Sequence, residues 1–224
     1  MLDLTQTIAT LVLDHSELAP VLQRHRLDFC CRGNMTLAAA CAEKGLDVET
    51  VGAELTRAVA ERGAQASPDH NPREESTQAL IERIVATHHA YLREVLPFVQ
   101  RTAAKVARVH GEHNPRLVPL NDAVQSLCAA LLPHLDAEEQ VLFPAMIAPT
   151  PDRTVIEGAL ASMQSDHLEV GDLMAKIRTE TEDFTLPVWA CNSYRALFSE
   201  LVNLETDILT HVHLENHVLM PRYA

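Results

Sequence analysis

Two stretches of the chain share a pattern of residues that can ligate metal ions. Residues 134–144 are HLDAEEQVLFP and residues 211–221 are HVHLENHVLMP, so both contain H-x-x-x-E-x-x-V-L, then Phe or Met, then Pro. A histidine and a glutamate four positions apart lie on the same face of an α-helix. Each stretch can therefore present an imidazole and a carboxylate to one metal ion or to two adjacent ions. For one copy alone, an ordinary contact between neighbouring surface side chains is the alternative interpretation.

Four long helices are predicted to position these pairs, over about 76–111, 119–148, 153–181 and 187–220. Apolar residues recur every three or four positions in each, which predicts the inward-facing stripes of a left-handed, antiparallel four-helix bundle. The second stripe comprises Val124, Leu127, Leu131, His134, Glu138 and Val141. Pro97 and Pro133 predict kinks within their helices, and Pro221 predicts the end of the last one.

Each stripe has one histidine at a core position, and the second and fourth also have a glutamate one turn later. A buried carboxylate without a partner is costly, and two divalent ions would satisfy all of these groups. Imidazole with carboxylate suits iron, zinc, manganese or copper, and carboxylate-bridged pairs in bundles are typically di-iron or di-manganese. A single core histidine is more often packed than metal-bound, but six residues in phase favour a metal site. The candidate ligands are His89, His134, His167 and His211, with Glu138 and Glu215 as bridges.

The remaining histidines fit this arrangement less well. His88 also follows an apolar stripe of the first helix, so spacing alone does not choose between His88 and His89. His110 is in phase with His89 but lies about 31 Å further along a straight helix, which favours a structural or channel role. His213 and His217 are expected to face away from the centre that His211 faces.

The chain as a whole is predicted to be all-α, with three parts. Residues 1–60 are expected to form a small helical domain, in which Thr5 or Thr7 caps the first helix and Asp47 caps another. This domain carries the adjacent cysteines Cys30 and Cys31. Residues 61–75 mix Gly, Pro, Ser and charged residues, which is typical of a linker, and residues 76–224 form the bundle.

Composition restricts the partners that the protein could have. The formal net charge of −13 argues against binding to nucleic acid or to anionic membranes. No apolar run is long enough to span a bilayer, and the N-terminus lacks the features of a secretory signal. Five irregularly spaced cysteines argue against a disulfide framework and favour a reducing cytoplasm.

Several of these motifs together resemble a known family. The segments LDFCCRGNMTLAAAC, HHAYLREVLP, HLDAEEQVLFP, SDHLEVGDL and HVHLENHVLMP are similar to those of the iron–sulfur cluster repair di-iron proteins, which have a hemerythrin-like bundle and a short cysteine-bearing N-terminal domain. The resemblance favours His89 over His88 as the ligand. Two positions depart from related patterns: Gly171 stands where oxygen-carrying hemerythrins have another histidine, and Arg32 stands where the family usually has glycine.

The resemblance implies a stress protein that restores iron–sulfur proteins damaged by nitric oxide or oxidants. Its two iron ions would bind nitric oxide or oxygen, and either reduce nitric oxide to nitrous oxide or donate iron to damaged clusters. Cys30 and Cys31 would supply electrons or accept nitric oxide or iron; packing as small side chains is the alternative. A non-enzymatic protein that senses or sequesters nitric oxide or oxygen is the competing hypothesis. The oligomeric state stays open, with a homodimer as one option.

Overall fold

Helices are the only regular elements in the part of the chain that the computed structural model describes, residues 2–63 and 71–223. The one β-type contact within these ranges is an isolated antiparallel bridge between Thr7 and Thr36. The predicted all-α class is therefore confirmed. None of the described helices is both long enough and apolar enough to span a bilayer. The chain divides into two compact units, one comprising Met1–Ser76 with Leu209–Arg222 and the other Thr77–Ile208 with Tyr223–Ala224.

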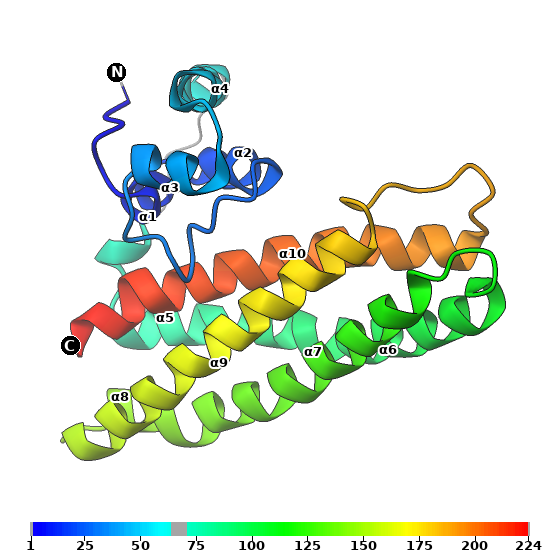
Figure 1. The fold of residues 1–224 in the computed structure, drawn as a ribbon. Coiled ribbons are helices and arrows are strands. Elements are labelled where there is room, and N and C mark those ends of the chain that lie inside the picture. Colours follow the sequence, from blue (N-terminus) through cyan, green and yellow to red (C-terminus); the bar gives the residue numbers. More distant parts are fainter. Residues whose placement is uncertain (1, 64–70, 224) are drawn as a thin grey trace. The chain divides into compact units, whose positions relative to one another are not determined.

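Short helices form the N-terminal part of the first unit (Figure 1). They are α1 (Ile8–Asp14), α2 (Ala19–Arg24), α3 (Leu37–Lys44) and α4 (Val48–Gly63), with a 3-10 turn at Ser16–Leu18 between α1 and α2. Thr7 caps α1 by accepting a hydrogen bond from the N–H of Thr10 at 3.2 Å. Asp47 accepts one from the N–H of Thr50 at 3.1 Å, at the start of α4. Both predicted caps are thus confirmed.

The stretch 61–75, predicted as a linker, has helical residues at both ends. Helix α4 runs to Gly63, and a 3-10 turn covers Pro72–Glu74. Residues 64–70 of the predicted linker lie outside the described residues. The first unit also contains a C-terminal segment, in which the end of α10 is followed by a π-helical turn at Glu215–Leu219 and a 3-10 turn at Met220–Arg222.

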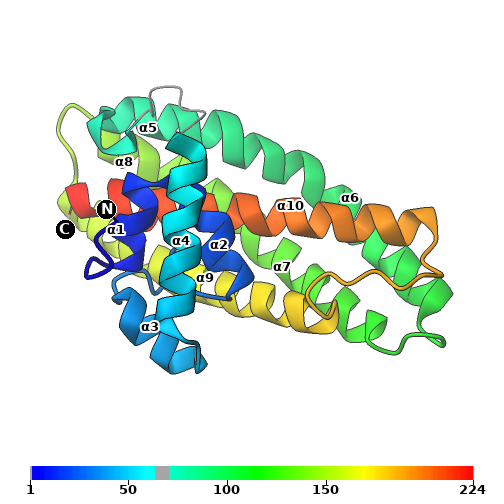
Figure 2. The same cartoon turned by 90° about the horizontal axis from the view of Figure 1, so that it is seen from above.

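Four long helical segments form the second unit (Figures 1 and 2). The first runs from α5 (Thr77–Ile84) through a π-helical turn (Val85–His89) into α6 (Ala90–His110). The second runs from α7 (Leu117–Ala137) through a π-helical turn (Glu138–Leu142) into α8 (Phe143–Ile147). The third is α9 (Arg153–Glu180), and the fourth is α10 (Asn192–Leu214), which belongs to this unit up to Ile208.

Polar contacts between the helices show that neighbours run antiparallel. Residues early in one helix meet residues late in the next for α6 with α7, α7 with α9, and α10 with α6, and α9 also contacts α10. The contacts are Arg93 with Asp136, Gln100 with Gln125, Arg116 with Glu180, Arg178 with Glu205, and Lys105 with Ser193. The antiparallel four-helix bundle predicted from the apolar stripes is confirmed.

The apolar stripes fill the interior of this bundle, as predicted. Each stripe contributes buried side chains, among them Leu92, Leu96, Val124, Leu127, Leu131, Met163, Val170, Met174, Leu197, Leu201 and Leu204. Burying one such side chain contributes about 1.5–3 kcal/mol to folding. Pro97 and Pro133 do not end their helices, because α6 and α7 each extend on both sides of these residues. This interior is what holds the histidines of the stripes in register.

One member of the second stripe does not lie where the stripe predicted. Val141 is 49% exposed, whereas Leu142 and Phe143 are each 2% exposed. The reason is the π-helical turn at Glu138–Leu142, which takes more residues per turn than the 3.6 that the prediction assumed. Residues after Glu138 are therefore rotated relative to a uniform α-helix, and the prediction for Val141 was wrong.

Candidate metal centre

Glu138 lies between two of the predicted histidine ligands of the second unit. Its Oε1 is 3.2 Å from Nε2 of His134, and its Oε2 is 3.4 Å from Nε2 of His89. The two histidines come from different helices, and all three side chains are at most 5% exposed. A carboxylate with one imidazole at each oxygen has the donor arrangement that a bridging ligand of two metal ions needs.

His167 of α9 joins the same group. Its ring centroid lies 5.0 Å from that of His134, and the ligand atoms of His134, Glu138 and His167 all lie within 4.8 Å of one another. His167 is 1% exposed. Within the second unit, the structure thus brings together His89, His134, Glu138 and His167.

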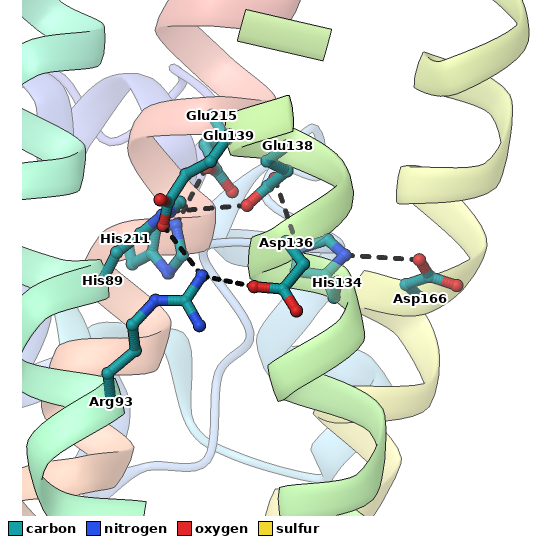
Figure 3. A network of polar contacts seen from close by, with 9 residues as sticks. All are labelled: His89, Arg93, His134, Asp136, Glu138, Glu139, Asp166, His211 and Glu215. Carbon is teal, nitrogen blue, oxygen red and sulfur yellow. Dashed lines mark hydrogen bonds and ion pairs between the residues drawn. The ribbon is translucent and has the colours of Figure 1, made fainter. Parts of the chain in front are cut away.

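His211 and Glu215 form a pair in the first unit. Nε2 of His211 lies 2.8 Å from Oε1 of Glu215, and the two residues are 1% and 0% exposed (Figure 3). The spacing of four residues therefore does place an imidazole and a carboxylate side by side, as it does for His134 and Glu138.

Within residues 2–63 and 71–223, each of the three π-helical turns contains a predicted ligand. His89 is the last residue of the turn at Val85–His89, and Glu138 and Glu215 are the first residues of the other two. Such turns within α-helices occur frequently at functional sites. Sequence periodicity did not predict them.

Outer hydrogen bonds hold the rings of two histidines (Figure 3). Nδ1 of His89 donates to Oε1 of Glu139 at 2.9 Å, and Arg93 donates to the same carboxylate at 3.1 Å. Nδ1 of His134 donates to Asp166 at 3.2 Å. These bonds leave the Nε2 atoms, which face Glu138, with the lone pairs that a metal ion requires. Glu139 and Asp166 were not predicted from the sequence.

The pKa of Glu139 fits its role as an acceptor. Burial alone would raise the pKa of this carboxyl, but the hydrogen bonds from His89 and Arg93 outweigh burial and hold its pKa below its usual value. Glu139 is therefore ionised at neutral pH and keeps the proton of His89 on Nδ1.

The environment of Glu138 suits a metal cation. The side chain is 2% exposed, and neither of its oxygens accepts a hydrogen bond from the described residues, although two imidazoles approach it. A buried carboxylate without hydrogen bonds is costly unless a cation compensates its charge. Because imidazole nitrogen and carboxylate oxygen donors suit iron, these residues fit an iron site.

The other predicted candidates lie elsewhere. Nδ1 of His88 is 2.8 Å from Oδ1 of Asp207, so His88 ties the first helical segment of the bundle to α10. His110 lies at the far end of α6, where its Nε2 is 3.3 Å from Sγ of Cys191 and its ring packs near Trp189. These contacts support a structural role for His110, as its distance along the helix from His89 predicted.

Cys30 and Cys31 lie in a loop of the first unit. Their Sγ atoms are 3.5 Å apart, and Oδ1 of Asp28 accepts hydrogen bonds from the N–H of Cys30 at 3.1 Å and from the N–H of Cys31 at 2.8 Å. Three side chains of the C-terminal segment hold this loop through two carbonyls. His213 donates to the carbonyl of Phe29, and Asn216 and His217 donate to that of Cys30, at 3.0, 3.0 and 2.8 Å.

Comparisons with known proteins match both the N-terminal part and the bundle of this chain. The family described as "Hemerythrin HHE cation binding domain" matches residues 80–223, and "Domain of Unknown function (DUF542)" matches residues 4–59. The chain is 33% identical over 217 residues to the iron–sulfur cluster repair protein YtfE of Escherichia coli O157:H7, covering 97% of this chain and 96% of the relative. It is 30% identical over 224 residues to the iron–sulfur cluster repair protein ScdA of Staphylococcus haemolyticus, covering 97% of each. The chain therefore belongs to the family of iron–sulfur cluster repair proteins with a hemerythrin-like cation-binding bundle.

Proposed function

We propose that six residues of this chain hold two iron ions in one carboxylate-bridged centre. They are His89, His134, Glu138, His167, His211 and Glu215. The observation that carries the proposal is the burial of Glu138 between two imidazoles without a hydrogen bond to either oxygen. Glu215 would be the second bridge, because it repeats the relation of Glu138 to its histidine.

Helix continuity supports the inclusion of His211 and Glu215. The hydrogen bond between His88 and Asp207 joins α10 to the π-helical turn that ends in His89. His211 follows Asp207 by one turn on the same helix, and therefore lies on the same face as Asp207. A centre that includes His89 is thus within the expected reach of His211.

The proposed activity is the repair of damaged iron–sulfur clusters under nitrosative or oxidative stress. The named function of both relatives supports it. We propose that nitric oxide or oxygen is the small ligand. We also propose that the protein acts in a reducing cytoplasm, where its five free cysteines would stay reduced. When bound, the iron would supply open coordination positions and redox electrons for the ligand. The buried histidines and glutamates would hold the ions apart from bulk water, and Glu139 and Asp166 would keep the imidazole protons on Nδ1.

Turnover of nitric oxide distinguishes the enzyme from a protein that only binds it. The iron-loaded chain is mixed with nitric oxide and a reductant, and nitrous oxide is measured over many equivalents. Steady production would support reduction, whereas uptake that stops at one stoichiometric equivalent would support sequestration. Glu138→Ala should abolish either activity, and Glu157→Ala, which changes an exposed carboxylate of α9, is the control.

Repair itself needs a separate assay. An enzyme with a [4Fe–4S] cluster is inactivated by nitric oxide and then incubated with the iron-loaded chain. We expect its activity to return with wild-type protein and with the Glu157→Ala control but not with Glu138→Ala. Equal recovery with the Glu138→Ala protein would contradict a repair role for this centre.

A further inference from the structure

A second group of metal-ligating side chains lies in the loop of the first unit. The carboxylate of Asp28 and the thiols of Cys30 and Cys31 offer ligand atoms that all lie within 4.8 Å of one another. Cys30 is 2% exposed, and its Sγ lies 3.2 Å from Oδ1 of Asp28 and 3.5 Å from Sγ of Cys31. Three potential ligands therefore converge within four consecutive residues.

The distance between the two thiols suits a shared metal ion. Two thiolates bound to one tetrahedral ion at about 2.3 Å each lie about 3.8 Å apart. Linear coordination would require about 4.6 Å, and a disulfide about 2.05 Å. The observed 3.5 Å is nearest to the tetrahedral value.

Hydrogen bonds already hold the loop in this conformation. Asp28 is oriented by the N–H groups of Cys30 and Cys31. The carbonyls of Phe29 and Cys30, which flank the Cα of Cys30, accept the bonds from His213, Asn216 and His217. A site whose ligands are positioned before binding loses less conformational entropy when an ion arrives.

The electrostatics of the loop couple the binding of a cation to the loss of thiol protons. The pKa of the Cys30 thiol is well above its usual range because of its hydrogen bond with Cys31, its burial, and the neighbouring Asp28 carboxylate. Each of these causes disfavours a second negative charge in the loop when no cation is present. A bound divalent ion would reverse this, since it binds thiolates and carboxylate directly.

We propose that Asp28, Cys30 and Cys31 form a second metal site, which binds a thiophilic divalent cation of the zinc or ferrous type through two thiolates and one carboxylate oxygen. Three protein ligands leave the fourth tetrahedral position for water or another small ligand, as in open zinc sites. Such a site exchanges its ion more readily than one with four protein ligands. The proposal does not depend on the centre that contains Glu138, because it uses no residue of that centre.

Cobalt(II) is the probe that tests this site alone. Thiolate-to-cobalt charge transfer absorbs in the near ultraviolet, whereas histidine and carboxylate ligands do not produce this band. The full-length chain, reduced beforehand and freed of metal, is titrated with cobalt(II), and circular dichroism checks each variant for folding. We expect the band to reach the intensity of one cobalt–thiolate site per chain in the wild type, and to reach the same intensity in Glu138→Ala.

Variants of the loop decide whether its residues are the ligands. Cys30→Ser and Cys31→Ser should each lose the band. Asp28→Asn keeps an oxygen that can accept the two N–H hydrogen bonds. Its affinity for cobalt should fall by about tenfold or more, because even the loss of a residue that only supports a ligand typically costs about that much. Cys191→Ser, at an exposed cysteine, should bind as the wild type does. Absence of the band in the folded, fully reduced wild type, or its persistence in both serine variants, would overturn the proposal.

Discussion

At the scale of single residues, Gly33 shows why the loop beside Cys31 needs a glycine. A Cβ atom at this position would lie 2.7 Å from Cβ of Ala9 and 2.7 Å from Nε2 of His217, and it would also collide with the carbonyl oxygen of Phe29. His217 in turn holds the carbonyl of Cys30. The preceding position carries Arg32.

We predict that Gly33→Ala lowers the free energy of unfolding by about 1–3 kcal/mol, because backbone and ring atoms must shift to admit the methyl group. The matched control is Gly158→Ala in α9, where a Cβ meets nothing within 4 Å. That substitution should be neutral or stabilising by about 0.5–1 kcal/mol, since alanine favours helix. Urea unfolding followed by circular dichroism measures both. Equal stability of the two variants would show that the crowding at Gly33 is relieved without cost.

Cys128 and Cys191 should differ in reactivity. Burial raises the pKa of Cys128 to about 11, and its Sγ lies 3.8 Å from the carbonyl oxygen of Leu96 inside the bundle. At pH 9 only about 1% of this thiol would be ionised, and the thiolate is the reactive form. Mass spectrometry after iodoacetamide treatment at pH 9 should find the exposed Cys191 modified roughly tenfold faster or more. Comparable rates in the native protein would contradict this difference.

The position of a residue relative to the apolar stripes explains whether the sequence could predict it as part of the site. His134, Glu138 and His167 lie in phase with apolar stripes, and this phase alone was enough to place them together. Glu139 and Asp166 lie one residue outside those stripes, so they looked like ordinary surface residues. Their contacts with histidines depend on how two helices pack, which periodicity along one helix does not contain. Asp28 was likewise missed, although its position two residues before Cys30 fits a local turn.

At the scale of elements, the helices were predictable and their irregular turns were not. A stripe counted at 3.6 residues per turn assumes a uniform helix. The π-helical turn at Glu138–Leu142 breaks that assumption, which is why Val141 is exposed where it was expected to be buried. The prediction of His134 and Glu138 was unaffected because His134 precedes the turn and Glu138 is its first residue. The irregular turn thus lies next to the ligands, and the apolar pattern did not predict it.

One buried ion pair joins two helices of the bundle and should contribute strongly to stability. Nε of Arg178 in α9 donates to Oε1 of Glu205 in α10 at 2.7 Å, and Nη2 of the same guanidinium contacts Oε2. Glu205 is 4% exposed. We predict that Glu205→Ala costs about 3–5 kcal/mol, because it leaves a buried guanidinium without its main partner.

Denaturant unfolding of a matched set tests this pair. Combining Arg178→Met with Glu205→Leu should recover most of the lost stability, because neither charge then remains buried. Arg116→Met removes the exposed contact with Glu180 and should cost less than about 1 kcal/mol. If Glu205→Ala costs no more than Arg116→Met, then water already screens the Arg178 pair.

At the scale of the whole molecule, the division of the chain does not follow the sequence order. Length and composition predicted a small N-terminal part and a bundle, but the first unit also takes in Leu209–Arg222 from the other end of the chain. This association rests on hydrogen bonds between segments nearly two hundred residues apart. No local propensity encodes such a contact, so it could not be inferred from the order of motifs.

A fragment of residues 1–76 should therefore be less stable than the same residues in the full chain. It lacks His213, Asn216 and His217, whose side chains satisfy the carbonyls of Phe29 and Cys30. We expect amide exchange in residues 28–36 of the fragment to be at least tenfold faster than in the intact protein, which corresponds to the loss of about 1.4 kcal/mol of local stability. Identical exchange rates would show that the C-terminal segment does not stabilise the loop.

The central claim, that six histidine and glutamate residues hold two iron ions, is tested most directly by iron analysis with Mössbauer spectroscopy. Wild-type protein expressed with ample iron should contain about two high-spin, non-haem irons per chain, as in carboxylate-bridged bundles. Glu138→Ala should lose at least one of them, while Glu157→Ala keeps both. Wild-type protein that binds no iron, or a Glu138→Ala variant with the iron content and spectrum of the wild type, would contradict the account.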